Sequence, residues 1–327
     1  MKLPIVRIIL FLLLTAVFVS GLIAYSHSRG NEFTTPVDEE NEFSLSEENS
    51  KRYEKQFTVT PGGLVIVEAD AGSIYLNSWD KNEVSIVVEI EGNDSRAEKY
   101  VVDFSQEGNT VKVVGKVRDK SFFKWHVGSL EARYTINVPR QFNSHVNTSG
   151  GDIEAKEITG TADLETSGGD ITLYHINGES NLITSGGDIE AKEIVGNVDA
   201  ETSGGDVICE NITGNVFGST SGGDVEIRSV NGRVKAETSG GSIAVRLSGE
   251  NQGIDASTSG GNISIFIPSD AKATIEAETT GGSVECDLPV TVKGKVRDSE
   301  LYGTINGGGN VIRAGTSGGS ITITGLK

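Results

Sequence analysis

Five aspartates recur at equal distances along the chain, and they form the pattern best suited to chemistry. They are Asp152, Asp170, Asp188, Asp206 and Asp224, each 18 residues after the one before. If successive repeats stack at the spacing of β-strands, neighbouring carboxylates lie about 5 Å apart and repel by roughly 1 kcal/mol in water. Such a ladder could hold Ca²⁺ ions along its length. Alternatively, each carboxylate accepts hydrogen bonds from backbone amides of its own Ser-Gly-Gly turn.

The later repeats favour the hydrogen-bonding interpretation of this column. The equivalent residues there are Ser242, Asn262, Ser283 and Ser320. Serine and asparagine bond backbone groups well and bind Ca²⁺ poorly. The calcium-binding nonapeptide GGxGxD does not occur in the sequence. We therefore expect no metal and no cofactor, with the calcium ladder as the less favoured alternative.

The cysteines and histidines are not arranged for catalysis or metal binding. No CxxC or HExxH motif occurs in the sequence, so redox-motif and zinc sites have no basis. Cys209 and Cys286 occupy the same inward repeat position, four repeats apart. Four strand spacings make about 19 Å, which is beyond disulfide reach, so we predict two free, buried thiols. The histidines are scattered at His27, His126, His145 and His175.

One aromatic cluster outside the first 25 residues could bind a ligand. Phe122, Phe123 and Trp125 lie within KSFFKWHVG, flanked by lysines and a histidine. They could contact a carbohydrate or a lipid headgroup. The favoured interpretation is that they form a hairpin tip that folds over the open edge of the first coil, because repeat arrays need capped ends.

A repeated phrase must position these side chains. TSGGDI or a close variant begins at nine threonines, with a first run of 18-residue intervals followed by intervals of 20 and 21 residues. Self-similarity at a fixed period is the signature of a repeat architecture. The threonines are Thr148, Thr166, Thr184, Thr202, Thr220, Thr238, Thr258, Thr279 and Thr316.

Each repeat contains two short strands with one buried face. Counted from its threonine, positions 6 and 8 are apolar, as are position 11 while the 18-residue period holds and most residues at positions 15 and 17. The residues between them are mostly polar. Glycines at positions 3, 4 and 13 allow successive turns to stack closely. Because whole columns match, stacked coils explain the pattern better than the hairpins of a sandwich. We therefore predict an all-β fold, a single-chain β-solenoid (β-helix) of stacked coils of about 18 residues.

Coils are also expected before and after the regular array, which gives domains 51–146 and 147–327. ADAGSIYL at 69–76 is similar to a degenerate copy of the repeat, so coiling should begin near Gly62. An excursion over roughly 92–130 then interrupts the coils. At the other end the aperiodic stretch 288–304 is expected to cover the last coil, whose edge could otherwise pair with another molecule.

The N-terminus is expected to direct the chain to a membrane. Residues 1–25 contain two positive charges followed by an uncharged apolar run, which predicts an N-terminal transmembrane helix or a signal segment; we favour the anchor. Residues 26–50 are rich in acidic side chains and predict a disordered linker. Either interpretation exports the body, because positive charge stays on the cytoplasmic side. The net charge of −18 argues against a nucleic-acid partner.

The repeats, together with LNSWDKNEVSI (76–86) and GTSGGSITI near the C-terminus, resemble a large bacterial family of adhesin-like proteins. The resemblance covers roughly residues 57–327. It implies a Gly-rich β-solenoid at the cell envelope and assigns no catalytic residue. Some members stand in operons for the envelope stress response, which implies an accessory envelope role.

Three functions are compatible with these features. The first is a non-enzymatic scaffold or adhesion module at the cell membrane, with an envelope protein or glycan as partner. The second is an envelope-stress sensor or regulator, which would need a membrane partner because only seven residues precede the apolar run. The third and least favoured is a polysaccharide-active enzyme. Its carboxylates would need a cleft built from loops, and coils of 18 residues leave no room for such loops.

Overall fold

The computed structural model describes residues 50–92, 95–118, 130–292 and 297–326. Almost all of these residues lie in strands or tight turns, and one short helix, α2 (Ser95–Lys99), interrupts them. None of the helices in these ranges is long and apolar enough to span a bilayer. The expected membrane segment (residues 1–25), nearly all of the acidic linker and the aromatic cluster at 122–125 lie outside the described residues.

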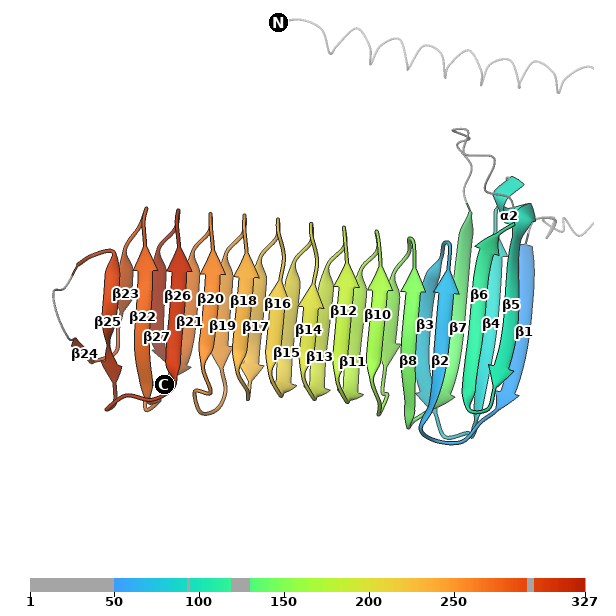
Figure 1. Cartoon of the computed structure of the whole chain (residues 1–327), viewed down its shortest axis with the longest axis horizontal. Helices are drawn as coiled ribbons and strands as arrows, with labels where there is room; N and C mark the ends of the chain where they lie inside the picture. The colour runs from blue at the N-terminus through green and yellow to red at the C-terminus, as the bar shows by residue number, and fades with distance from the viewer. Residues whose placement is uncertain (1–49, 93–94, 119–129, 293–296, 327) are drawn as a thin grey trace, which may run out of the picture. The chain divides into compact units, whose positions relative to one another are not determined.

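The strands form two sheets, and Figure 1 shows them following one another side by side. In spatial order, sheet A contains β1 (Ser50–Thr58), β4 (Glu83–Glu91), β7 (Glu131–Pro139), β3 (Ser73–Trp79), β9 (Ile153–Lys156), β11 (Ile171–Asn177), β13 (Ile189–Val195), β15 (Val207–Thr213), β17 (Val225–Val230), β19 (Ile243–Leu247), β21 (Ile263–Pro268), β27 (Ile321–Leu326) and β23 (Val284–Cys286). Sheet B contains β5 (Tyr100–Glu107), β6 (Thr110–Val117), β2 (Gly63–Ala69), β8 (Phe142–Thr148), β10 (Ala162–Thr166), β12 (Ser180–Thr184), β14 (Val198–Glu201), β16 (Val216–Ser219), β18 (Val234–Thr238), β20 (Ile254–Thr258), β26 (Val311–Thr316), β22 (Ala273–Thr279), β25 (Glu300–Ile305) and β24 (Val290–Val292).

The predicted stacking of equivalent residues is confirmed within the regular array. Ile171 pairs with Ile153 on one side and with Ile189 on the other, in parallel register. All three side chains are fully buried between the sheets. The same in-register pairing continues through β13, β15 and β17. The apolar columns read from the sequence are therefore the core of an all-β solenoid.

The repeat threonines connect one coil to the next. Thr184 Oγ1 donates a hydrogen bond of 2.8 Å to the carbonyl oxygen of Gly169 in the preceding coil. Thr184 Oγ1 also accepts the backbone N–H of Gly187, in the same turn, at 3.4 Å. Equivalent bonds recur in the neighbouring coils. The buried threonine column therefore forms hydrogen bonds between successive coils.

A column of left-handed residues was not expected from the sequence. Repeat position 10 has a positive φ, between 55° and 59°, in five successive coils, although none of these residues is glycine. Positions 8 and 11 both point inward, so one additional residue must be absorbed between them, as in a β-bulge. The left-handed residues are Glu157, His175, Glu193, Asn211 and Ser229.

At both ends of the solenoid the spatial order departs from the chain order. The coil β2/β3 lies between β6/β7, which comes later in the chain, and β8/β9. The coil β26/β27 lies between β20/β21 and β22/β23, both of which precede it. Coiling therefore begins near Gly62 as expected, and the excursion after it forms a further coil beside the first one. The expectation that repeats stack in chain order is wrong at the C-terminal end.

Both ends of the core are covered by antiparallel additions. At the N-terminal end β5 joins β6 and β4 joins β7. The hydroxyls of Tyr100 and Tyr134 lie 2.7 Å apart there, and burial raises the pKa of both phenols. The aperiodic stretch after residue 288 does add β24 and β25, and β25 pairs with β22. It thus covers the coil that lies last in space, not the last coil of the chain.

Candidate functional site

The aspartate column bonds backbone amides, but across coils. Asp170 Oδ1 accepts the amide N–H of Asp188 at 2.8 Å, and Asp152 Oδ1 accepts that of Asp170 at 3.0 Å. The bonds of Asp188, Asp206 and Asp224 follow the same pattern. The expectation that each carboxylate bonds its own turn is therefore wrong. In a later coil this position is Asn262, and its Oδ1 accepts the backbone N–H of Ser320 in the same way.

The two cysteines are free, and only one of them is fully buried. Cys209 lies in β15 inside the core, and burial raises the pKa of its thiol to about 12. Cys286 is half-buried, because β23 is the last strand of sheet A within the described residues. The insertion of β27 makes the separation five strands rather than four, or about 24 Å. The prediction of two buried thiols is thus wrong for Cys286.

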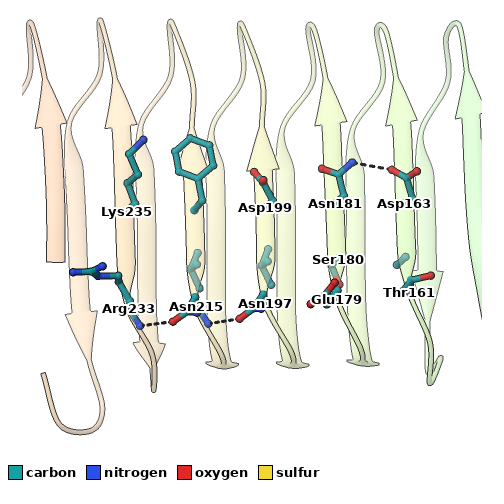
Figure 2. Close-up of a pocket in the computed structure, with 14 residues that line it drawn as sticks. Thr161, Asp163, Glu179, Ser180, Asn181, Asn197, Asp199, Asn215, Arg233 and Lys235 are labelled. Atoms are coloured by element: carbon teal, nitrogen blue, oxygen red, sulfur yellow. Dashed lines mark hydrogen bonds between the residues drawn. The ribbon is translucent and has the colours of Figure 1, made fainter. Parts of the chain in front are cut away.

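A groove lies on the outward face of sheet B. It crosses five strands, from β10 to β18, near the points where these strands begin, and has a volume of about 580 Å³ (Figure 2). Its walls come from repeat positions 14 and 16, with the buried position 15 between them. The wall residues are Thr161, Glu179, Asn197, Asn215 and Arg233 at position 14, and Asp163, Asn181, Asp199, Phe217 and Lys235 at position 16.

One wall of the groove presents hydrogen-bond donors. Asn197 Oδ1 accepts the backbone N–H of Asn215, and Asn215 Oδ1 accepts the backbone N–H of Arg233, both at 3.0 Å. These bonds fix the orientation of each amide group. The Nδ2 groups of Asn197 and Asn215 have no acceptor among the described residues, so both remain available to a ligand.

The opposite wall presents acceptors. Asn181 Nδ2 donates to Asp163 Oδ1 at 2.8 Å, which leaves Asn181 Oδ1 as its available atom. On the next strand, Asp199 accepts no hydrogen bond from the described residues. Partial burial raises the pKa of the Asp199 carboxyl above its usual range, and the charge of Lys235 partly offsets this effect. Two acceptors thus lie on adjacent strands with no protein donor between them.

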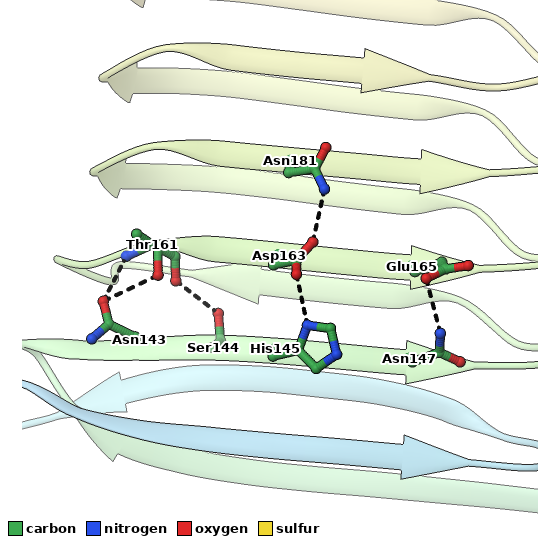
Figure 3. Close-up of polar contacts among 8 residues, drawn as sticks. All are labelled: Asn143, Ser144, His145, Asn147, Thr161, Asp163, Glu165 and Asn181. Atoms are coloured by element: carbon green, nitrogen blue, oxygen red, sulfur yellow. Dashed lines mark hydrogen bonds and ion pairs between the residues drawn. The ribbon is translucent and has the colours of Figure 1, made fainter. Parts of the chain in front are cut away.

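The two ends of the groove differ in charge. At the β10 end, His145 Nδ1 lies 2.6 Å from Asp163 Oδ2, so Asp163 is held by side chains from the coils on both sides (Figure 3). At the β18 end, Lys235 Nζ lies 4.6 Å from the centre of the Phe217 ring and 3.1 Å from a Glu237 carboxylate oxygen. The groove therefore runs from carboxylates to a basic, partly aromatic end.

One buried hydroxyl under the groove has no partner. Ser180 lies at position 15, where neighbouring coils have Ala162 and Val198, and its side chain is 3% exposed. Its Oγ forms no hydrogen bond within the described residues. In the coil before Ala162, Ser144 Oγ donates to the Thr161 carbonyl at 3.3 Å. Ser144 and Ser180 thus occupy the same column, but only the Ser144 hydroxyl forms a hydrogen bond within the described residues.

The sequence pattern did not reveal this groove. The repeat is recognised by its inward positions, which have the same or similar residues in every coil. The groove is lined by positions 14 and 16, whose residues vary among the coils. That variation was the available signal, since identical inward residues require only packing. The structure also brings together no group of three or more His, Cys, Asp or Glu side chains that could hold a metal within the described ranges.

These features define a class of protein: a β-solenoid with parallel stacked coils and a lateral groove. The chain belongs to the Toastrack DUF4097 family, whose profile matches residues 70–324. Among curated proteins, none matches the chain.

Several crystal structures are similar to this chain at low identity. A protein from Bacteroides fragilis, provisionally named an adhesin, is 15% identical with a TM-score of 0.39, over 84% of this chain and 97% of that one. A protein from Parabacteroides distasonis, provisionally named lipid-binding, is 16% identical with a TM-score of 0.44, over 86% and 98%. A provisionally named cell adhesion protein from Clostridium sporogenes is 14% identical with a TM-score of 0.20, over 84% and 100%. Likeness at this level carries no argument about ligand or activity.

Proposed function

We propose that the protein is a non-enzymatic scaffold or adhesion-type module of the bacterial cell envelope. In this proposal residues 1–25 anchor the chain as a single membrane span, and the solenoid lies outside the cytoplasm. The positive residues before the apolar run, and the length of that run, support this orientation. The partner is an envelope protein or a glycan.

The observation that carries the proposal is the construction of the regular coils. Their backbone groups and recurring threonines form hydrogen bonds between coils, so the array is rigid and its outward side chains stand at fixed spacing. Between Ile153 and Leu247 the strands are joined by connections of no more than five residues. Connections this short do not enclose a substrate. The outward faces are long surfaces whose side chains vary, which suits binding better than turnover.

Attachment of whole cells tests this function. The full chain would be expressed in a bacterial host that lacks it. Attachment to surfaces coated with purified cell-wall polysaccharide, and to surfaces coated with extracted envelope protein, would be compared with that of vector cells. We expect more attached cells and no release of new reducing ends from the polysaccharide. Equal attachment would contradict the proposal, and released reducing ends would establish an enzyme instead.

A further inference from the structure

We propose that the groove across β10–β18 binds an extended, neutral, β-linked polysaccharide lying along the stack of coils. This inference rests on the proposed function and specifies its partner. It is drawn from the available hydrogen-bonding groups, the charge distribution and the spacing of the groove walls.

The hydrogen-bonding groups on the two walls fit hydroxyls. Asn197 and Asn215 offer N–H donors on one wall, and Asn181 and Asp199 offer acceptors on the other. A sugar hydroxyl both donates and accepts, so it can satisfy either wall. A ligand donor between Asn181 Oδ1 and Asp199 would also supply the partner that these two acceptors lack.

The spacing of the walls fits a linear chain of sugars. Equivalent side chains on adjacent strands repeat at about 4.8 Å, and the groove spans four such steps, or about 19 Å. Successive sugars of an extended β-1,4-linked chain advance by a similar distance, so that each sugar faces one coil. Phe217, the one aromatic residue lining the groove, supplies an apolar surface for the C–H face of a sugar.

The charges favour a neutral chain. Asp163, Glu179 and Asp199 line the groove over its first three strands, whereas Arg233 and Lys235 lie together on β18. An anionic polymer would face these carboxylates along most of the groove. A cationic polymer would meet the basic end. Lys235 is in addition already engaged by Glu237 and the Phe217 ring.

Calorimetric titration of the full chain in detergent micelles tests the inference. The probes are cellohexaose and the hexamer of N-acetylglucosamine, which are β-1,4-linked, extended and neutral, maltohexaose, which is α-linked and curved, and a hexamer of galacturonic acid, which is anionic. We expect at least one of the first two to bind, and at least ten-fold more tightly than either of the others.

Two variants of the same strand form a matched pair. Asp199→Ala removes an acceptor from the groove, whereas Glu201→Ala removes an exposed carboxylate two residues further along β14, outside the groove. We expect at least a ten-fold loss of affinity for Asp199→Ala, the usual effect of losing a hydrogen bond to a charged group, and no change for Glu201→Ala. Equal affinities of the two variants would overturn the inference, as would the absence of binding by both extended probes or preferred binding of the curved or anionic one.

Failure of this inference can be distinguished from failure of the proposed function. If cells bearing the chain attach to polysaccharide but the purified chain binds neither extended probe, the groove assignment is wrong and the adhesion function remains. If both extended probes bind with the expected variant pattern but attachment does not increase, the groove assignment stands and the adhesion function is wrong.

Discussion

The carbonyl oxygen of Gly169 lies 2.0 Å from the position that a Cβ on Gly187 would occupy. A methyl group at residue 187 would therefore collide with the backbone of the preceding coil, and that backbone is held in register on both sides. The adjacent Gly186 has no atom of another residue nearer than 3.7 Å to its own Cβ position. Two neighbouring glycines of the same turn thus tolerate a side chain very differently.

We expect Gly187→Ala to destabilise the solenoid by about 3 kcal/mol, at the upper end of overpacking effects. Gly186→Ala should be neutral or slightly stabilising, because alanine restricts the unfolded chain. Denaturant titrations of both variants, followed by circular dichroism, measure the difference. Equal midpoints would show that the coils can separate locally at little cost.

The unpartnered Ser180 hydroxyl predicts a stabilising substitution. Removing a buried polar group that has no hydrogen bond should raise the free energy of unfolding by about 1 kcal/mol, so Ser180→Ala should melt at a higher temperature. Ser144→Ala is the matched control, since Ser144 donates a hydrogen bond in the same column and should not gain stability. Thermal unfolding of both variants checks this; a lower melting temperature for Ser180→Ala would indicate a bound water on its Oγ.

The raised pKa of Asp199 predicts a pH dependence of stability. Burial disfavours the charged carboxylate in the folded state, so between the unfolded and folded pKa values the folded chain binds more protons. The contribution of Asp199 to stability therefore falls as pH rises through that range. We expect Asp199→Asn to melt at a higher temperature than the parent at pH 7, with the difference vanishing near pH 3. Glu201→Gln, which changes an exposed carboxyl group on the same strand, is the control variant.

Thiol labelling should distinguish the two cysteines. Burial raises the pKa of Cys209 to about 12, so almost no thiolate exists at pH 8 and the sulfur is also inaccessible. Cys286 is half-buried on the terminal strand β23 and should react slowly but measurably. Iodoacetamide followed by mass spectrometry should modify Cys286 first, and Cys209 only in denaturant. Prior modification of Cys209 in the native chain would contradict the register of β15.

The columns of the solenoid could be predicted from the sequence, but not its order at the ends. Identical inward residues, such as Ile153 and Ile171, specify which atoms lie over one another. The phrases at Thr279 and Thr316 are nearly equivalent, so each offers the same contacts to the coil of Thr258. Nothing in the phrase itself distinguishes which copy becomes the neighbour. That choice depends on the antiparallel strand β25, which pairs with β22.

Neither the left-handed backbone conformation at repeat position 10 nor the groove could be predicted from the repeat pattern, and the reasons differ. Glu157, His175 and Asn211 share a backbone conformation but no side-chain chemistry, so only the uneven step between inward positions signalled them. The groove depends on outward residues that vary among the coils. Their mutual contacts, such as that of Asn181 with Asp163, appear only once the coils are aligned in space.

The position of the coil Val311–Leu326 between two earlier coils has a consequence for biosynthesis. A ribosome releases this segment after both of its neighbours have already emerged. Until then, the facing edges of β20/β21 and β22/β23 each lack a strand partner. A chain that stops short of Val311 would either stack β22/β23 directly on β20/β21 or leave both edges open to proteolysis and to association with other chains. The native order of coils at this end therefore forms only after residues 311–326 have been synthesised.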